Sequence, residues 1–466
     1  MTPSQSAYIP DSWCKLNAWL ILLSGAGLLS IWPLPSTIAL RHVFLGVGFI
    51  ASAYYLYLDR NTLLHRRTWP LWLLMGFYGW LLIHLAFFSH EWDLQMAELS
   101  SLWMRALLAL PLGLSVGLLL SRIEYRSLST ELGPKLLLGK IATLLLFLGL
   151  AGTFVIFFGR YLYEVYLTHQ WLHFNFYWVP YKAKPPFVVA SALFLPLCFI
   201  LIMRALDTLT STCWIALALI GIALAFFGDY FANTKNGMLI FAVCIALLMA
   251  RYLFNLQWTT KRIVLGAPIL MFVLLLSTYG IDQHIKKNLA WPRLIADIKV
   301  AIDIDHQQWW KDDKVCCAPI NSVGVPVDIS TYQRTAWFMV GSRLLTENPQ
   351  GFGLIHHSFG WLAGAKYPDF FKPIGGTRGA THSAWMDFAL AVGIPGLLLV
   401  LIPLWVSWCR SLSQNGLWAS YTSWTIPVLA FAYLITEANE AHFIELLFFM
   451  VAFFCGTTLA KQRETQ

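Results

Sequence analysis

One histidine stands where it could act as a base. His382 lies in the segment Ala380-Thr-His-Ser-Ala-Trp-Met-Asp387, where a long polar stretch gives way to an apolar run. An imidazole is the side chain best suited to accept a proton near neutral pH. The alternative is a histidine that only caps a helix or lies at a membrane interface, and the residue type alone leaves both interpretations open.

Several cations could hold a phosphate near this histidine. Arg334 and Arg343 lie nine residues apart in the run 331–345, whose apolar residues recur at helical spacing. Lys235 stands in a short polar turn between two apolar runs. A guanidinium can donate two parallel hydrogen bonds to a phosphate. Arg41, Arg105 and Arg378 are weaker candidates for binding the same phosphate. For each cation the alternative is a solvated loop charge or an interfacial anchor.

Metal and nucleotide chemistry have little support in the chain. The polar residues near the same face include His356, His357, His442, Glu437 and Glu440, but they show no HExxH or Cys/His metal spacing. There is also no GxxxxGK[ST] sequence to cradle nucleotide phosphates. We therefore expect no metal and no other cofactor, so that the energy of any reaction comes with the substrate.

The composition is typical of a chain embedded in a membrane. Of the 466 residues, 58% are hydrophobic and only 12% are charged, against about 25% charged in soluble domains. The mean hydropathy is +0.62. The 22 Trp and 18 Tyr suit the two membrane interfaces. The net charge of +8 comes from basic residues scattered through loops, so we expect lipid rather than nucleic acid as a partner.

Apolar windows close to the ~20 residues that cross a bilayer recur along the chain. They predict an all-α polytopic membrane protein of about twelve transmembrane helices, the first one retained rather than cleaved as a signal peptide. The predicted spans are 16–34, 39–58, 69–89, 104–121, 138–158, 186–203, 211–228, 237–254, 263–280, 384–408, 417–435 and 443–460.

Three regions follow from these spans. Residues 1–280 hold helices one to nine, 281–381 form a large external loop domain, and 382–466 hold the last three helices. The loop domain is predicted to be a mostly helical cap. A second outer loop, 159–185, is rich in aromatic residues and is expected at the membrane interface.

The distribution of charge predicts an orientation. With both termini in the cytoplasm, the short inner loops hold most of the Lys and Arg, as short cytoplasmic loops do. The first outer loop instead carries Glu91, Asp93 and Glu98. This orientation places His382 and the phosphate-binding candidates at the outer face.

Three motifs between about 230 and 400 resemble those of the O-antigen ligase family, whose wider group includes O-antigen polymerases and protein O-oligosaccharyltransferases. Lys235-Asn-Gly-Met-Leu239 is similar to the first, with Lys where ligases commonly show Arg. Arg334 ahead of Asn348-Pro-Gln-Gly-Phe-Gly353 resembles the second. His382 followed by Gly393-Ile-Pro-Gly396 resembles the third, although Ser383 stands where Asn is common.

The resemblance implies a glycosyltransferase C-type layout in the bacterial inner membrane, with the active site facing the periplasm. It implies a polysaccharide on undecaprenyl pyrophosphate as donor and a sugar hydroxyl of lipid A–core as acceptor. By resemblance, His382 is the general base, and Arg334 and Lys235 hold the pyrophosphate. The reaction would invert the anomeric carbon and need neither metal nor ATP.

Three other functions stay open. An O-antigen polymerase uses the same donor, and sequence barely separates it from a ligase. Protein oligosaccharyltransferases are usually longer, with an added C-terminal domain. A polysaccharide transporter or flippase usually shows paired repeats and charges near the middle of the membrane, whereas the polar residues here gather near one face.

Overall fold

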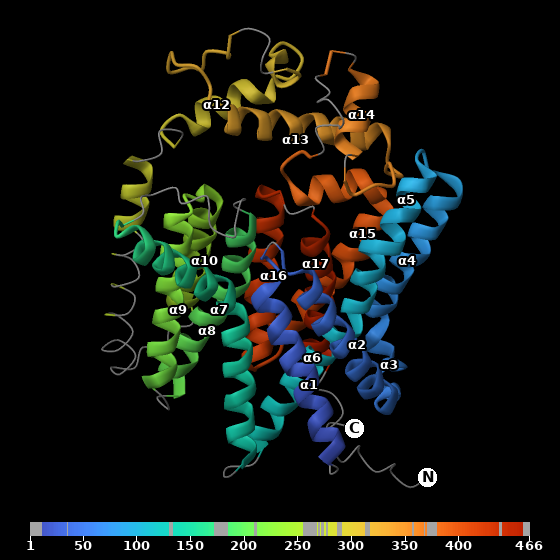
Figure 1. The fold of residues 1–466 in the computed structure, drawn as a ribbon, viewed down its shortest axis with the longest axis vertical. Helices are drawn as coiled ribbons and strands as arrows, with labels where there is room; N and C mark the ends of the chain where they lie inside the picture. The colour runs from blue at the N-terminus through green and yellow to red at the C-terminus, as the bar shows by residue number, and fades with distance from the viewer. Residues whose placement is uncertain are drawn as a thin grey trace.

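The computed structural model describes residues 12–34, 36–129, 134–171, 185–208, 212–254, 278–286, 291–312, 317–356, 358–367, 369–370, 380–437 and 440–459, with 268, 271 and 275. Its named elements are all helices, arranged as an upright bundle with a layer of helices across one end (Figure 1). The bundle helices are α1 (Ser12–Ile31), α2 (Ile38–Leu58), α4 (Trp69–Phe87), α6 (Met104–Ser129), α7 (Pro134–Thr168), α8 (Pro185–Thr208), α9 (Thr212–Phe231), α10 (Lys235–Phe254), α15 (Ala384–Leu412), α16 (Leu417–Ile435) and α17 (Ala441–Leu459).

Shorter helices connect the bundle or form the layer above it. Those beside the bundle are α3 (Arg60–Leu63), η1 (Arg66–Thr68), α5 (Trp92–Glu98) and η2 (Leu99–Trp103). Those in the layer are α12 (Leu294–Ile302), η3 (Gln308–Trp310), α13 (Ile329–Glu347) and α14 (Ser358–Lys366). We call the described residues 291–370 the cap layer.

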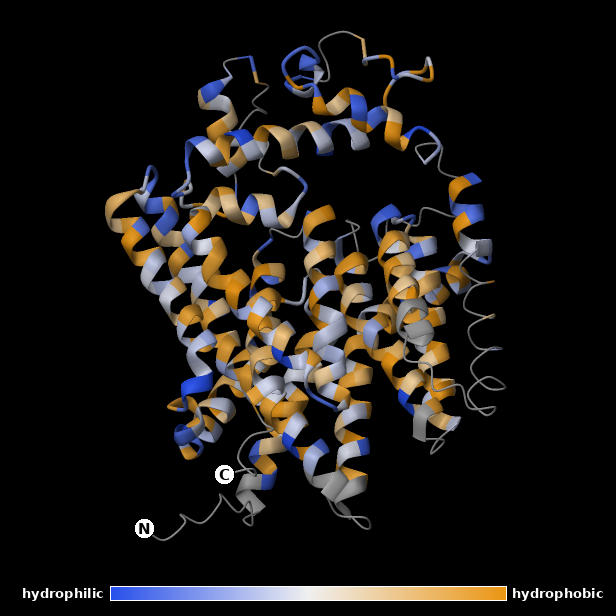
Figure 2. Cartoon of the chain, turned by 180° about the vertical axis from the view of Figure 1, so that it is seen from behind, coloured by the Kyte–Doolittle hydropathy of each residue, from blue (hydrophilic) through white to orange (hydrophobic). Residues whose placement is uncertain are grey.

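The chain is an α-helical protein with helices suited to a membrane. Eight helices in the described ranges are long and apolar enough to cross one, and they coincide with eight predicted spans. Three more predicted spans coincide with α1, α10 and α16. The span predicted at 263–280 falls mostly outside the described residues, so the total of twelve stays a prediction. Apolar residues dominate the bundle, and polar ones gather at its ends and in the cap layer (Figure 2).

The helix α7 is longer than predicted. The predicted span ended at residue 158, and an aromatic loop was expected from 159 onward, but the helix continues to Thr168. Arg160 and Glu164 lie one turn apart and form an ion pair of 2.5 Å. Such pairs at a spacing of four residues favour the helical conformation. Residues 172–184 of the predicted loop lie outside the described residues.

Helices α6 and α17 cross at very close range. A Cβ on Gly113 would lie 2.1 Å from the carbonyl oxygen of Phe449, and one on Gly117 would lie 2.3 Å from that of Phe453. Gly456 faces the carbonyl of Leu114 in the same way. Small residues let helix backbones approach where no hydrophobic effect drives association in lipid. This contact holds the middle of α6 against the second half of α17.

Basic residues predicted for the inner side meet at the end of the bundle opposite the cap layer, where α3 lies (Figure 1). Arg122 donates to Asp59 at 2.5 Å and to Thr62 of α3 at 3.2 Å. Arg410 donates to the carbonyl of Arg67 at 2.8 Å. The bundle therefore has two chemically distinct ends.

The cap layer has a hydrophobic core of its own. Trp310, Tyr332, Trp337 and Phe359 are buried there with other apolar residues. Met386 and Leu390 of α15 belong to the same core, so the layer is joined to the bundle through the start of this helix. The start of α15 lies across the end of the bundle beneath α13, and the rest runs down beside α4 (Figure 1).

A backbone break in α15 docks the cap layer. Gly393 has φ 70° and ψ 178° inside this helix, which divides it in two. The segment 349–353 pairs with the break: Phe352 N donates to Leu390 O at 2.8 Å, and Gly353 N donates to Ala391 O at 2.7 Å. Ile394 N donates to Pro349 O at 2.8 Å. The break frees backbone groups of α15, and the cap segment satisfies them.

Candidate functional site

His382 lies in a tight turn at the start of α15. Its φ is +62°, a left-handed conformation that is uncommon for residues other than glycine. The buried carboxylate of Asp387 holds this turn by accepting hydrogen bonds from the backbone and hydroxyl of Thr381, at 2.7 and 2.8 Å. Ala384 N donates to Thr436 O at 3.0 Å, which ties the turn to the end of α16. The surrounding contacts therefore fix the position of His382.

The imidazole of His382 has a carboxylate partner and an aromatic support. Its Nδ1 forms a hydrogen bond with Glu437. Its ring stacks on Trp337 of α13, with centroids 5.3 Å apart and planes inclined by 16°. The side chain is 28% exposed. With Nδ1 bonded to a carboxylate, the tautomer that leaves a lone pair on Nε2 is favoured, as a base requires.

Glu437 is a functional candidate that the motifs did not single out. Burial acts to raise the pKa of its carboxyl, but the hydrogen bond and charge of His382 and the charge of Arg334 outweigh burial and leave the pKa below its ordinary value. The carboxylate is therefore charged at neutral pH. Its position in the short turn between two predicted spans is a signal in the sequence, but the residue type there suggests a metal ligand as readily as a partner of His382.

Arg334 presents an unused guanidinium to the same site. It is partly buried on α13, one turn before Trp337. Burial lowers its pKa, against the charges of Glu437 and Asp328. Within the described ranges its guanidinium forms no hydrogen bond or ion pair, and these two acids act on it only through their charge. Five unengaged donors in a partly buried position suit an anion such as a phosphate.

Lys235 reaches the same helix from the bundle. It is the first residue of α10, and its Nζ lies 3.6 Å from Oδ1 of Asp328. Asp328 caps α13 by accepting from the backbone and hydroxyl of Thr331, at 3.0 and 2.9 Å. Burial acts to raise the pKa of Asp328, but Lys235 and these hydrogen bonds lower it. Lys235 thus lies near the start of the helix that carries Arg334.

The turn that carries Lys235 is built on a buried acid. Asp229 accepts from Ser191 at 2.6 Å and from Thr234 at 2.8 Å. A Cβ on Gly237 would lie 2.0 Å from Asp229, so this motif position has no room for a side chain. Asn236 donates to Thr436 at 3.1 Å, one residue before Glu437. The structure therefore brings together Lys235, Arg334 and His382, which lie far apart in the sequence.

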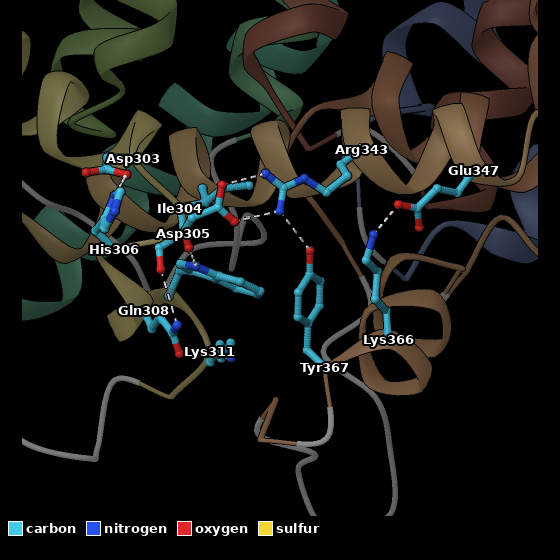
Figure 3. A network of polar contacts seen from close by, with 11 residues as sticks. Asp303, Ile304, Asp305, His306, Gln308, Lys311, Arg343, Glu347, Lys366 and Tyr367 are labelled. Atoms are coloured by element: carbon cyan, nitrogen blue, oxygen red, sulfur yellow. Dashed lines mark hydrogen bonds and ion pairs between the residues drawn. The ribbon is translucent and has the colours of Figure 1, made fainter.

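Arg343 lies away from this site. Nine residues make two and a half helical turns, so Arg343 and Arg334 occupy opposite faces of α13. Arg343 donates to both carboxylate oxygens of Asp305, at 2.7 and 2.8 Å, and to Tyr367 at 3.5 Å (Figure 3). This network joins parts of the cap layer, and it places Arg343 apart from the other predicted phosphate-binding residues on α13 and α10.

An Asp-x-Asp spacing is present in the cap layer at Asp303 and Asp305. Both acids are engaged on the exposed surface: Asp303 pairs with His306 at 2.7 Å and Asp305 with Arg343 (Figure 3). In the described part of the chain, no group of three or more His, Cys, Asp or Glu is placed to hold a metal ion.

Arg41 and Arg105, predicted as members of the same phosphate-binding set, form a separate group. Arg105 forms an ion pair of 2.5 Å with Glu445 of α17, and the charges of both act on Arg41. These two arginines therefore form a second group at the starts of α2 and α6. Arg378 lies outside the described residues.

The geometry combines a carboxylate-bound imidazole with cations that can bind an anion. A base and a phosphate clamp of this kind suit transfer of a group from a phosphate leaving group to a hydroxyl. No protein-family model and no curated protein matches the chain, so a function is inferred from these residues and their contacts.

Proposed function

We propose that this chain is an O-antigen ligase of the bacterial inner membrane, with its site in the periplasm. The donor is a polysaccharide on undecaprenyl pyrophosphate, and the acceptor is a sugar hydroxyl of lipid A–core. The observation that supports this most strongly is the convergence of three motifs. His382 is hydrogen-bonded to Glu437, whose charge acts on the unpaired Arg334 of α13, and Lys235 of α10 contacts Asp328 at the start of α13.

In the proposed reaction, Nε2 of His382 takes the proton of the acceptor hydroxyl while the oxygen attacks the anomeric carbon of the donor. The bond between that carbon and the pyrophosphate oxygen breaks, and the leaving lipid pyrophosphate keeps the electron pair. Arg334 and Lys235 neutralise the charge that develops on it. Attack from the side opposite the leaving group inverts the anomeric carbon.

Glu437 and Trp337 support His382 in this reaction. The carboxylate of Glu437 stabilises the imidazolium that forms when the proton arrives. The stacked indole of Trp337 limits rotation of the ring. The helical bundle with a cap layer at the same end as these residues is in keeping with a glycosyltransferase C-type layout, which remains part of the proposal.

Transfer by purified protein tests the proposal. Lipid-linked donor and lipid A–core are supplied in detergent, with a chelator and without nucleotide. A general base contributes roughly 10²–10⁴-fold, so His382→Ala should lose nearly all transfer while donor binding is retained. His306→Ala is the matched control, because His306 also pairs with an acid but lies on the exposed cap surface.

Near wild-type transfer by His382→Ala would refute the base assignment. A strict requirement for added divalent metal would refute the proposed metal-free mechanism. In cells, a strain lacking the protein should build the lipid-linked polymer without attaching it to lipid A–core, which a membrane gel of lipopolysaccharide detects.

A further inference from the structure

A second cluster of polar residues, with two arginines, lies at the starts of three bundle helices. Arg41 is in the first turn of α2, Arg105 in that of α6, and His442 in that of α17. Glu445, one turn further along α17, accepts from Arg105 at 2.5 Å and from the indole of Trp32 at 3.3 Å. The cluster is therefore organised around a buried carboxylate.

Arg41 is the unsatisfied member of this cluster. Its Nε is buried and has no hydrogen-bond partner. Within the described ranges, the guanidinium of Arg41 forms no ion pair, although Glu445 and Glu440 are close enough for their charges to act on it. Glu445 already accepts hydrogen bonds from Arg105 and Trp32. A partly buried cation without hydrogen bonds is costly unless an anion completes the site.

The cluster adjoins the His382 site but is separate from it. The charge of Glu437 acts on Arg334, whereas that of Glu440, three residues later, acts on Arg41 together with that of Glu445. The two acids act on each other through their charges, and Glu440 also lies 3.4 Å from Nδ1 of His442. The charge of Arg334 therefore acts on Glu437, and the charge of Arg41 acts on Glu440, three residues further along the chain.

Two groups of cations, one acting on Glu437 and the other on Glu440, suit a transfer between two phosphate-bearing substrates. The leaving pyrophosphate must depart on the side of the anomeric carbon opposite the attacking hydroxyl. A phosphate on the acceptor must therefore be held away from Arg334 and Lys235. We propose that Arg41, with Arg105 beside it, binds a phosphate of the acceptor lipid; this rests on the proposed function.

Steady-state transfer with each substrate varied in turn tests this subsite. Arg41→Ala should raise the KM for phosphorylated lipid A–core by about tenfold or more, since charge-assisted hydrogen bonds are lost. The KM for the donor should not change, and Arg41→Lys should recover part of the loss. With lipid A–core stripped of its core phosphates, wild type and Arg41→Ala should have the same KM.

A second acceptor distinguishes the source of the phosphate. If Arg41→Ala impairs use of a second lipid pyrophosphate as acceptor but not of lipid A–core, the subsite holds a pyrophosphate and the reaction is a polymerisation. A rise in donor KM alone would overturn the inference, because Arg41 would then belong to the donor site. A loss of kcat in Arg41→Ala with both KM values unchanged would also overturn the inference.

Failure of the proposed function would be recognised separately. Binding of phosphorylated lipid A–core to the purified protein is measured without donor, by titration of wild type, Arg41→Ala and the cap-surface control Arg343→Ala. Weaker binding by Arg41→Ala alone supports the subsite even if wild type transfers nothing. Equal binding by all three overturns it.

Discussion

At the residue scale, the pair of His382 and Glu437 determines how the site responds to pH. The pKa of Glu437 lies below its ordinary value near 4, so the carboxylate stays charged from neutral pH down to the acid range. The contact with His382 is therefore present above that ordinary value and is lost only as the pH falls through the lowered pKa.

Replacing Glu437 by glutamine should alter the pH profile of transfer. Glutamine carries no charge and no longer stabilises the imidazolium, so the acid limb of the pH–rate profile should move to lower pH. The weaker base should also reduce kcat at neutral pH by roughly tenfold or more. An unchanged profile would show that Glu437 only holds the turn. The measurement is kcat from pH 5 to 9 for both proteins.

Two arginines on one helix provide an internal comparison. Arg334→Ala should weaken donor binding by about tenfold or more, because a phosphate loses a bidentate partner. Arg343→Ala should leave donor binding unchanged, because that side chain pairs with Asp305 on the opposite face. Titration of the purified variants with lipid-linked donor measures both. Equal losses would mean that the cap layer as a whole, rather than Arg334, sets the affinity.

At the element scale, the break in α15 explains why a glycine follows the histidine motif. A Cβ on Gly393 would lie 2.3 Å from the carbonyl carbon and oxygen of Gln350, and 2.5 Å from Pro349 O. These are backbone atoms of the docked cap segment. Position 393 therefore requires a glycine, because its φ is positive and because the segment that follows α13 approaches it closely.

Gly393→Ala should separate the cap layer from the bundle. We expect a lower melting temperature of the detergent-solubilised protein and a loss of transfer, because both the backbone strain and the contact with the cap segment oppose the native structure. Gly324→Ala is the matched control: Gly324 has φ 79°, but nothing lies within 4 Å of the added carbon. If both variants melt alike, strain alone matters and the docking contact does not.

At the scale of the whole molecule, the two ends of the bundle should face opposite sides of the membrane. The end with the cap layer carries the site, and the end with α3 carries paired basic residues. Because Lys and Arg in short loops stay in the cytoplasm, the cap layer should face outward.

Cysteine labelling of intact cells checks this orientation. In a background without reactive native cysteines, His306→Cys on the exposed cap surface should react with a membrane-impermeant maleimide. Arg60→Cys in α3 should react only after the inner membrane is permeabilised. The reverse pattern would place the site in the cytoplasm and rule out the proposed substrates.

The sequence by itself determined the helical membrane character and the position of most spans. A run of about 20 apolar residues is long enough to cross a bilayer, so a span can be predicted from the local sequence without knowledge of tertiary contacts. The span predicted at 417–435 coincides with α16, and the predicted helix around 331–345 lies within α13. The end of α7 was misplaced because the helix continues past the apolar window through charged residues, among them the ion pair of Arg160 and Glu164.

Only the tertiary structure decided which of the predicted residues share a site. Arg334 and Arg343 look equivalent in sequence, but packing buries one beside Glu437 and leaves the other paired with Asp305 on the cap surface. Glu437 became a candidate only through its contact with His382, 55 residues earlier in the chain. Such contacts depend on how helices cross and where the chain turns back, and no local pattern of residues encodes them.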